Sequence, residues 1–499
     1  MAKRGRAFPH PWRFPKGPIV TREFDFRLSR RTLLRAGGGM VLAAAGSGRQ
    51  AWAAAATEYQ ITPAPGQAHL FGLGQELTDV WNYNRQIPGP VLRARQSEPL
   101  RVIVTNKLDQ DTTVHWHGIR LPNAMDGVPG LTQPPIKAGD SFTYEFTPPD
   151  AGTFWYHPHA NSLQQLGRGL AGALIIEEPE PVAVDRDILW MLTDWRLKPN
   201  RELATSFGNM MDAGMAGRVG NTVTLNGSVP ADQPVRAGER MRLRLLNAAL
   251  ARIMALRFDG HRPVIVAIDG QPCEPHEPDG GRLLLGPAMR IDVMIDMQGD
   301  PGQRYAVTDD FYQDLSYTLT YLSYSNDAPV RAHPLDTPLR LPRNPTPEPD
   351  LAAAERHDIV LQGGMMGGGM MAGMGGMNGM AMPGMDGGAV WAINGMSMTG
   401  DGQPGMQPLL TLQRGRSYIL TMRNQTAWWH PMHLHGHSFR VVSRNGVSVP
   451  HHQWSDTVLL PPKETVDCAF VADNPGDWML HCHVMDHQVS GLMTVLRVA

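Results

Sequence analysis

The sequence predicts an all-β protein built from several sandwich domains. Glycine occurs 53 times and proline 42 times in 499 residues, and both residue types interrupt helices and favour turns. Between these turns lie short runs of valine, isoleucine, leucine and threonine, which are typical of strands, whereas helical periodicity is scarce. The length exceeds one ordinary hydrophobic core, and a typical domain of about 150 residues gives about three domains.

The charge balance excludes one broad class of function. The formal net charge is -2 and the isoelectric point is about 6.8, so nothing favours a nucleic-acid or anionic-membrane partner. We therefore expect no nucleic acid as a ligand. The three cysteines, Cys273, Cys468 and Cys482, have no paired spacing, which argues against a disulfide framework.

Residues 1–56 resemble a twin-arginine export signal. The segment Ser29-Arg30-Arg31-Thr32 precedes a weakly apolar Gly/Ala-rich stretch to Ala45, and the run Ala-Trp-Ala-Ala-Ala-Ala ends at Ala56 and offers small residues for cleavage. The alternative is a membrane anchor, but the apolar run is too short and too rich in glycine to span a bilayer. We expect export by the twin-arginine translocase to the periplasm or cell envelope, a mature chain from about Thr57, and no permanent membrane anchor.

The first expected domain, residues 57–180, offers two pairs of histidines. Residues 100–105 and 141–146 alternate like half-buried strands. On an extended strand, positions i and i+2 face the same side, so each His-x-His pair presents two imidazoles to one site. A single pair is equally compatible with surface or hydrogen-bonded histidines, but two pairs together with a third cluster favour metal binding. The two pairs consist of His115, His117, His157 and His159.

The middle of the chain contains no further ligand pairs. Residues 181–345 include strand-like runs and isolated histidines, and we interpret them as a second domain that acts as a spacer. Residues 346–389 are expected to be a linker with a Met-rich tract. Nine methionines among glycines in residues 364–388 cannot build a core. Their soft sulfurs favour Cu(I), and the alternative is a disordered spacer that binds metal only adventitiously.

The third expected domain, residues 390–499, contains the segment around which we interpret the whole chain. If residues 479–483 form a strand, Cys482 points to one face while His481 and His483 point to the other. A thiolate with two imidazoles in a trigonal arrangement is the blue-copper site, whereas structural zinc usually takes four ligands. The other candidate ligands in this domain are His430, His433, His435 and His487.

The four histidine blocks, in this order, resemble those of the multicopper oxidase family. The blocks are His115-Trp-His-Gly, His157-Pro-His, His430-x-x-His-x-His and His481-Cys-His-x-x-x-His. The resemblance covers residues 57–499. It implies three consecutive cupredoxin-like Greek-key β-sandwich domains and four copper ions: one type 1, one type 2 and two type 3.

The resemblance also implies which residues bind each copper ion. The type 1 copper corresponds to His430, Cys482 and His487, and the type 2 copper to His115 and His433. One type 3 copper corresponds to His117, His157 and His483, and the other to His159, His435 and His481. The type 2 and type 3 ions would form a trinuclear centre between the first and third domains.

The implied activity couples two half-reactions. A small reducing substrate, a phenol or aromatic amine or Cu(I) or another metal ion, loses one electron at a time at the type 1 copper. Electrons pass through Cys482 to His481 and His483, and dioxygen is reduced to water at the trinuclear centre. We expect a monomeric, laccase-like oxidase. The alternatives are a copper-tolerance protein that acts as a cuprous oxidase or copper scavenger through its Met-rich tract, and a copper-free scaffold.

Three departures from the family pattern bear on substrate and potential. Leu492 stands where many bacterial relatives have an axial Met, and strand alternation should turn Met493 away, so we expect a three-coordinate type 1 copper with a raised potential; a local bulge that brings Met493 to the copper is the alternative. Thr426 and Trp428 replace the Asp and Met that bind substrate copper in cuprous oxidases. Trp428 and Trp429 could instead wall a pocket for an aromatic donor.

The proton supply is the last expectation. Some bacterial relatives have Glu directly after the second type 1 His, but here Gln488 stands there and cannot titrate. Asp126 lies eleven residues after His115, where the family has an acidic residue near the trinuclear site. We therefore expect Asp126 to manage protons, the alternative being a turn aspartate in Met-Asp-Gly.

Overall fold

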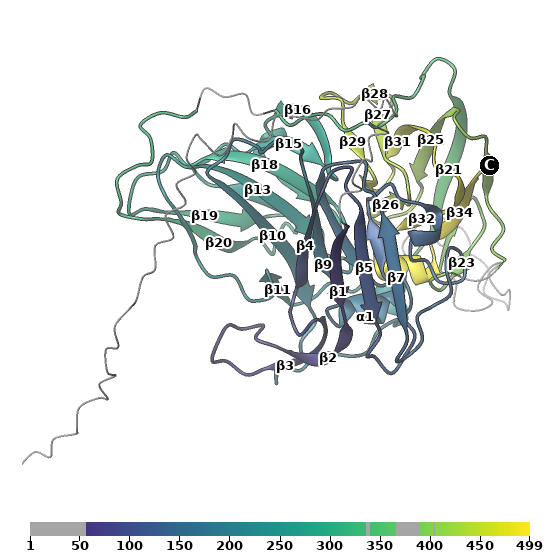
Figure 1. The fold of residues 1–499 in the computed structure, drawn as a ribbon, viewed down its shortest axis with the longest axis horizontal. Coiled ribbons are helices and arrows are strands. Elements are labelled where there is room, and N and C mark those ends of the chain that lie inside the picture. Colours follow the sequence, from purple (N-terminus) through teal and green to yellow (C-terminus); the bar gives the residue numbers. More distant parts are fainter. Residues whose placement is uncertain (1–55, 336–339, 366–389, 403–404) are drawn as a thin grey trace, which may run out of the picture. The chain divides into compact units, whose positions relative to one another are not determined.

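The computed structural model describes residues 56–335, 340–365, 390–402 and 405–499. Strands far outnumber helices among these residues, as the sequence predicts, and Figure 1 shows the strands coloured along the chain. The expected export signal, apart from Ala56, and the Met-rich tract beyond Met365 lie outside the described residues. No described helix combines the length and apolar character that crossing a membrane requires.

The first sandwich is formed by residues 57–177. Its strands are β1 (Thr57–Ile61), β2 (Pro63–Ala68), β3 (Thr78–Tyr83), β4 (Gly89–Arg95), β5 (Leu100–Thr105), β6 (His115–His117), β7 (Ser141–Phe146), β8 (Gly152–His157) and β9 (Gly172–Glu177). One sheet has the order β1-β5-β7, a second has the order β4-β9-β8-β6, and β2 pairs with β3. Buried and partly exposed residues alternate along β5, as expected for a strand with one face in a core.

The second sandwich contains residues 186–324. Its strands are β10 (Arg186–Trp195), β11 (Thr222–Leu225), β12 (Gln233–Val235), β13 (Arg240–Asn247), β14 (Met254–Phe258), β15 (Val264–Ile268), β16 (Gln271–His276), β17 (Leu283–Leu285), β18 (Arg290–Asp296), β19 (Arg304–Asp309) and β20 (Tyr317–Tyr324). Its two sheets have the orders β11-β10-β13-β18-β15-β16 and β12-β20-β19-β14-β17. The two sheets enclose an apolar core of their own.

The third sandwich begins at residue 355. Its strands are β21 (Glu355–Gly363), β22 (Trp391–Ile393), β23 (Met398–Thr399), β24 (Leu410–Leu412), β25 (Ser417–Asn424), β26 (His430–Leu434), β27 (Phe439–Arg444), β28 (Val447–Ser448), β29 (Trp454–Ser455), β30 (Thr457–Leu460), β31 (Thr465–Val471), β32 (Gly476–Cys482), β33 (Ser490–Gly491) and β34 (Met493–Val498). One sheet has the order β22-β21-β25-β31-β27-β28, with β29 on β27, and the other β24-β34-β32-β26-β30.

Strand β21 corrects one expectation from the sequence. It lies inside residues 346–389, which we expected to be a linker with a Met-rich tract, yet it pairs in parallel with β25 from Glu355 to Leu361. The physical reason is an alternating apolar pattern, in which Ile359 and Leu361 are fully buried. The proline-rich linker therefore ends before this strand.

Short helices complete the described structure. They are α1 (Ser162–Gly167), α2 (Met210–Gly214), α4 (Met485–Val489), and the 3₁₀ turns η1 (Asn123–Met125) and η2 (Asp279–Gly281). One contiguous group of buried apolar side chains includes residues of both the first and the third sandwich, such as Trp116 and Trp478. The first and third sandwiches thus share a packed boundary, and the histidine-bearing strands lie there.

Candidate metal centre

Strand β32 carries ligands for two different sites. It pairs with β26, with Met432 opposite Cys482 and His433 opposite His481. Because neighbouring side chains on a strand point to opposite faces, the sulfur of Cys482 leaves the strand on one side and the His481 imidazole on the other. The structure agrees with this expected alternation, since the two side chains join different clusters of potential ligands.

The first cluster consists of Cys482, His430 and His487. The Cys482 sulfur lies 3.5 Å from His430 Nδ1 and 3.7 Å from His487 Nδ1, and the two nitrogens are 3.2 Å apart. Metal–nitrogen bonds of about 2.0 Å and metal–sulfur bonds of about 2.3 Å would put the atoms of a trigonal site ~3.5 to 3.7 Å apart. The three ligand atoms therefore fit around one small ion.

The far nitrogens of both imidazoles are held by the protein. His487, on α4, donates from Nε2 to the carbonyl oxygen of Met215 at 2.8 Å, so its Nδ1 carries no proton in the neutral ring. His430 Nε2 lies 2.8 Å from the Thr426 hydroxyl. Burial raises the pKa of the Cys482 thiol, so ionisation of this sulfur requires a cation bound directly to it.

Leu492 and Met493 lie in different environments. Leu492 is fully buried in the same apolar cluster as Cys482. Met493 packs in another cluster, with Met479 and Val128. The pairing of β32 with β34 runs without a register shift and puts Met493 opposite His481. The thioether of Met493 therefore lies on the strand face opposite to the Cys482 sulfur, as strand alternation predicts.

The second cluster gathers the other eight candidate histidines at the boundary of the first and third sandwiches. All are buried, none being more than 2% exposed. Their ligand atoms form overlapping groups whose members lie within 4.8 Å of one another, and two of these groups are His115, His433, His435 and His159, His435, His481. His483 joins through its Nε2, which is 3.4 Å from His157 Nε2. The cluster consists of His115, His117, His157, His159, His433, His435, His481 and His483.

The facing nitrogens of His435 and His481 require a cation between them. His435 donates from Nδ1 to Asp126 Oδ2 at 2.9 Å, and His481 donates from Nδ1 to the Cys482 carbonyl at 2.9 Å. Each neutral ring then has a bare lone pair on Nε2, yet these two atoms are only 3.1 Å apart. Two lone pairs cannot hydrogen-bond to each other, whereas a metal ion would bind both.

Several other ring nitrogens are buried without a hydrogen-bond partner in the described part of the chain. Unsatisfied buried polar atoms are rare and call for an explanation. A metal ion bound at the centre of the cluster explains four of them, because each belongs to a proposed ligand whose other ring nitrogen is hydrogen-bonded. These four are His115 Nε2, His117 Nδ1, His159 Nε2 and His433 Nε2.

Burial favours the neutral form of several histidines in the two clusters. Burial, followed by repulsion from neighbouring imidazoles, lowers the pKa of His435 and His481 well below the ordinary value. The same cause, burial, lowers the pKa of His159 and of His487 to about 3. Neutral imidazole is the form that binds metal, so the protein holds these ligands ready at neutral pH.

Asp126 lies beside two of the clustered histidines. Its side chain is buried and accepts the hydrogen bond from His435, while its backbone carbonyl accepts one from His115 Nδ1 at 2.8 Å. The residue also ends the 3₁₀ turn η1. Asp126 therefore lies at a turn and also contacts the cluster, while its expected role in managing protons stays a prediction.

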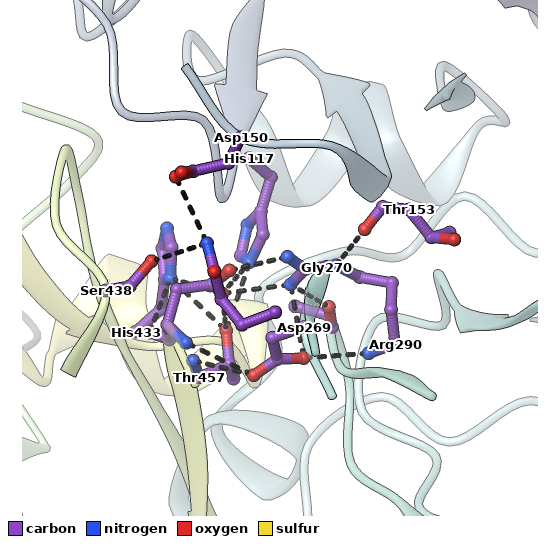
Figure 2. Close-up of polar contacts among 12 residues, drawn as sticks. His117, Asp150, Thr153, Asp269, Gly270, Arg290, His433, Ser438 and Thr457 are labelled. Atoms are coloured by element: carbon purple, nitrogen blue, oxygen red, sulfur yellow. Dashed lines mark hydrogen bonds and ion pairs between the residues drawn. The ribbon is translucent and has the colours of Figure 1, made fainter. Parts of the chain in front are cut away.

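A second buried carboxylate, Asp456, was missed by the sequence analysis. It accepts a hydrogen bond from His117 Nε2 at 3.1 Å, and its carbonyl accepts one from His433 Nδ1 at 2.9 Å. Burial alone would raise the pKa of Asp456, but the Arg290 guanidinium lowers it below the ordinary value. Figure 2 shows Arg290 in the same group of polar contacts as His117 and His433. An aspartate directly before the apolar run Thr457–Leu460 was the available signal.

Asp401 was also missed. Its carbonyl accepts a hydrogen bond from His159 Nδ1 at 3.2 Å, and its carboxylate contacts Ser162 and, at 3.4 Å, Gln488 Nε2. Burial raises its pKa to about 6. A carboxyl group thus lies next to Gln488, although residue 488 itself cannot titrate. The surrounding Thr-Gly-Asp-Gly sequence reads as a turn, so no pattern distinguished this residue.

The two tryptophans before His430 have different surroundings. Trp428 donates from Nε1 to the Met365 carbonyl at 2.7 Å. Trp429 lines an open cavity of about 570 Å³ together with Met289, Leu459 and other residues of the second and third sandwiches. Of the two, only Trp429 walls this cavity.

Comparisons with known proteins agree with this geometry. Three family models described as multicopper oxidase match residues 67–181, 186–327 and 381–499. Together they cover most of the chain and correspond to the three sandwiches.

Individual relatives span nearly the whole chain. Multicopper oxidase MmcO of Mycobacterium tuberculosis is 31% identical over 87% of this chain and 86% of its own length, and Laccase-2 of Botryotinia fuckeliana is 27% identical over 87% and 82%. A crystal structure of a multi-copper oxidase from Pseudomonas thermotolerans has a TM-score of 0.78 and 36% identity, covering 89% of this chain and 100% of that one. The chain therefore belongs to the multicopper oxidase family of copper-dependent oxidoreductases, with three cupredoxin-type domains.

Proposed function

We propose that the protein couples one-electron oxidation of small substrates at a type 1 copper to four-electron reduction of dioxygen to water at a trinuclear copper centre. The observation that carries the proposal is strand β32, which offers a sulfur to one trio of ligand atoms and an imidazole to the other cluster. Its hydrogen-bonded neighbour β26 likewise contributes His430 to the first cluster and His433 to the second.

The proposed ligand sets follow the two clusters. The type 1 copper is bound by His430, Cys482 and His487, whose spacing suits one ion. The trinuclear centre takes two type 3 ions and one type 2 ion. The type 3 sets are His117, His157, His483 and His159, His435, His481, and the type 2 pair is His115, His433.

The chain's own residues supply the path between the two sites. Bound copper supplies the redox chemistry. Cys482 is joined through the backbone to His481 and His483, so only a few covalent bonds separate the sulfur from the second cluster. The carbonyl of Cys482 also accepts the His481 hydrogen bond, which fixes that ring. Asp126 is positioned to hold or transfer a proton at its carboxylate beside His435.

The proposal is tested by measuring copper content, the visible spectrum and oxygen uptake on one preparation. We expect about four copper ions per chain, an intense blue band from the Cys482 thiolate, and one dioxygen consumed per four phenol molecules with no hydrogen peroxide released. Copper-loaded protein without the blue band, or peroxide as the product, would contradict the proposal.

The axial position of the type 1 copper gives a further prediction. With Leu492 near Cys482 and Met493 in a different cluster, no thioether weakens the three strong bonds, and the potential should be high. Leu492→Met is expected to lower the potential measured by redox titration of the blue band. Leu492→Ile serves as the control and should leave the potential nearly unchanged. A Leu492→Met variant with an unchanged potential would rule out this assignment.

A second candidate function is copper tolerance through oxidation or scavenging of Cu(I). It is favoured by the thioethers of Met210 and Met211, which are 53% and 60% exposed on α2, and by the Met-rich sequence of the tract. Helix α2 precedes Met215, whose carbonyl binds the type 1 ligand His487. Against it, Thr426 and Trp428 bond within the protein and offer no metal ligand of the cuprous-oxidase type.

Oxygen uptake with two substrates separates these functions. Deleting residues 366–388 should leave phenol oxidation nearly unchanged and lower the rate with Cu(I) severalfold if the tract delivers copper. A matched variant replaces the methionines of this segment with leucines and keeps its length. An equal loss of oxygen uptake with phenol and with Cu(I) would mean that the deletion damages the oxidase itself.

The sequence supports three further proposals about the protein's surroundings. The twin-arginine motif indicates export to the periplasm or cell envelope by the twin-arginine translocase. Dioxygen and a small reductant are the expected partners, and we propose a monomer. Size-exclusion chromatography with light scattering and fractionation of cells carrying Arg30→Lys/Arg31→Lys test these points.

A further inference from the structure

The second sandwich contacts the trinuclear cluster through one buried arginine. Arg290, the first residue of β18, is fully buried. Its two terminal nitrogens donate to the two carboxylate oxygens of Asp456 in the third sandwich, and its Nε donates to the Thr153 carbonyl in the first sandwich at 3.1 Å. One guanidinium therefore joins all three sandwiches, as Figure 2 shows for its surroundings.

Asp456, held by Arg290, in turn forms hydrogen bonds with two proposed copper ligands. Its Oδ1 accepts from His117 Nε2 at 3.1 Å and from the Thr457 hydroxyl at 2.8 Å. Its carbonyl accepts from His433 Nδ1 at 2.9 Å. With these nitrogens occupied, the opposite nitrogens, His117 Nδ1 and His433 Nε2, are the bare ones. The orientation of both rings thus depends on where Asp456 is held.

Asp269 fixes the backbone of the same segment. It lies in the Asp269-Gly270 turn between β15 and β16, where both residues have positive φ, as two-residue hairpin turns favour. One carboxylate oxygen accepts from the backbone N–H of Asp456 at 3.3 Å and of Thr457 at 3.1 Å, and the other accepts from the Arg290 N–H at 2.9 Å. Side chain and backbone of residue 456 are therefore both held from the second sandwich.

Gly118, directly after His117, leaves the space for this contact. Its φ is 86°, and a Cβ at this position would collide with the guanidinium of Arg290 and the carboxylate of Asp456. The chain thus approaches the ion pair as closely as a glycine allows. The pair is packed against the backbone of a proposed ligand and not merely near it.

We propose that Arg290 is a positioning residue of the trinuclear centre: from the second sandwich, it holds Asp456 in the place that orients His117 and His433 for copper. The inference rests on the proposed ligand assignment. It gives the second sandwich, which the sequence suggests is a spacer without ligands, a specific part in building the metal centre.

The test compares Arg290→Lys with Arg244→Lys. Arg244 is a matched control because it is also buried, lies on the neighbouring strand β13, and donates to Thr153 Oγ1 at 2.9 Å, but it forms ion pairs with Asp187 and Asp292. Lysine keeps the charge in both variants but cannot hold a carboxylate through two parallel hydrogen bonds.

Arg290→Lys is expected to bind copper roughly 10- to 100-fold more weakly at the trinuclear centre, the range typical when the hydrogen-bonding surroundings of metal ligands are disturbed. Chelator competition followed by electron paramagnetic resonance should therefore show early loss or altered hyperfine splitting of type 2 copper, while the blue type 1 band persists. Arg244→Lys should keep the wild-type order of copper loss, even if the apoprotein unfolds at a lower temperature.

The outcomes separate this inference from the proposed function. If the wild type binds all its copper and Arg290→Lys retains trinuclear copper equally well, only the inference fails. The inference would also be overturned if both arginine variants bound copper more weakly, and to the same degree, at the type 1 site and at the trinuclear centre. If the wild type forms no trinuclear centre, both fail. If Arg290→Lys does not fold, Asp269→Asn replaces it in the test, because asparagine keeps the side-chain volume and removes one acceptor. This variant is expected to bind copper more weakly at the trinuclear centre and not at the type 1 site. Unchanged copper binding at the trinuclear centre would refute the inference.

Discussion

Cys482→Ser is expected to abolish the blue band and reduce oxygen uptake with a phenol to the rate of protein-free buffer. Serine is nearly the same size but offers no thiolate, so the trigonal site loses its strongest bond and the route from substrate to the second cluster is cut. The eight histidines are untouched, and the variant should retain about three of four copper ions. Visible absorption, copper analysis and oxygen uptake on one preparation measure all three effects.

Cys468→Ser provides the matched control. Cys468 is equally buried in the third sandwich, and burial raises its pKa too, but it belongs to none of the potential metal groups among the described residues. Its replacement should lower stability modestly, because a hydroxyl is buried, and leave the blue band intact. A Cys482→Ser variant that still turns over dioxygen would refute the electron path through this sulfur.

Asp126→Asn is expected to slow turnover about 100-fold, the lower range for loss of a proton-transferring group. The amide oxygen can still accept the hydrogen bond from His435, and the backbone carbonyl still accepts from His115, so the copper ligands should remain in place. The rate at which substrate reduces the type 1 copper, measured without oxygen as the bleaching of the blue band, should equal that of the wild type. Only the oxygen-dependent half of the cycle should slow.

Asp140→Asn, at an exposed aspartate of the same sandwich, controls for the removal of a charge. It should change neither half of the cycle. If Asp126→Asn reduces dioxygen at the normal rate, Asp126 serves the turn and the ring of His435 alone. If it instead loses copper, the residue positions a ligand and its proposed role in proton transfer is wrong.

The sequence predicted those parts of the structure that depend on local pattern. Alternation along residues 100–105 and 141–146 identified β5 and β7, and the spacing within His481-Cys482-His483 predicted two faces of one strand. Local pattern also misled once, because a proline-rich segment nearby suggested that residues 355–363 were linker, although Ile359 and Leu361 mark a buried strand.

The sequence could not predict the contacts that join distant segments. His117 and Asp456 are 339 residues apart, and the sequence around either residue does not indicate that the two are in contact. Arg290 reads as an ordinary polar position of a strand until the fold buries it. Such partners are determined by how the sandwiches dock, and docking depends on side-chain packing that periodicity does not encode.

The position of strand β32 limits which sequence changes the metal centre can accept. The strand pairs with β26 on one side and with β34 on the other, so both neighbours fix its hydrogen-bonding register. Sliding it by a single residue would send sulfur among the eight imidazoles and an imidazole into the trigonal site, exchanging the two chemistries. Residues 477–480, which supply no ligand, should therefore tolerate conservative substitution far better than any insertion or deletion, and a functional transplant of this centre must move the strand at its native length.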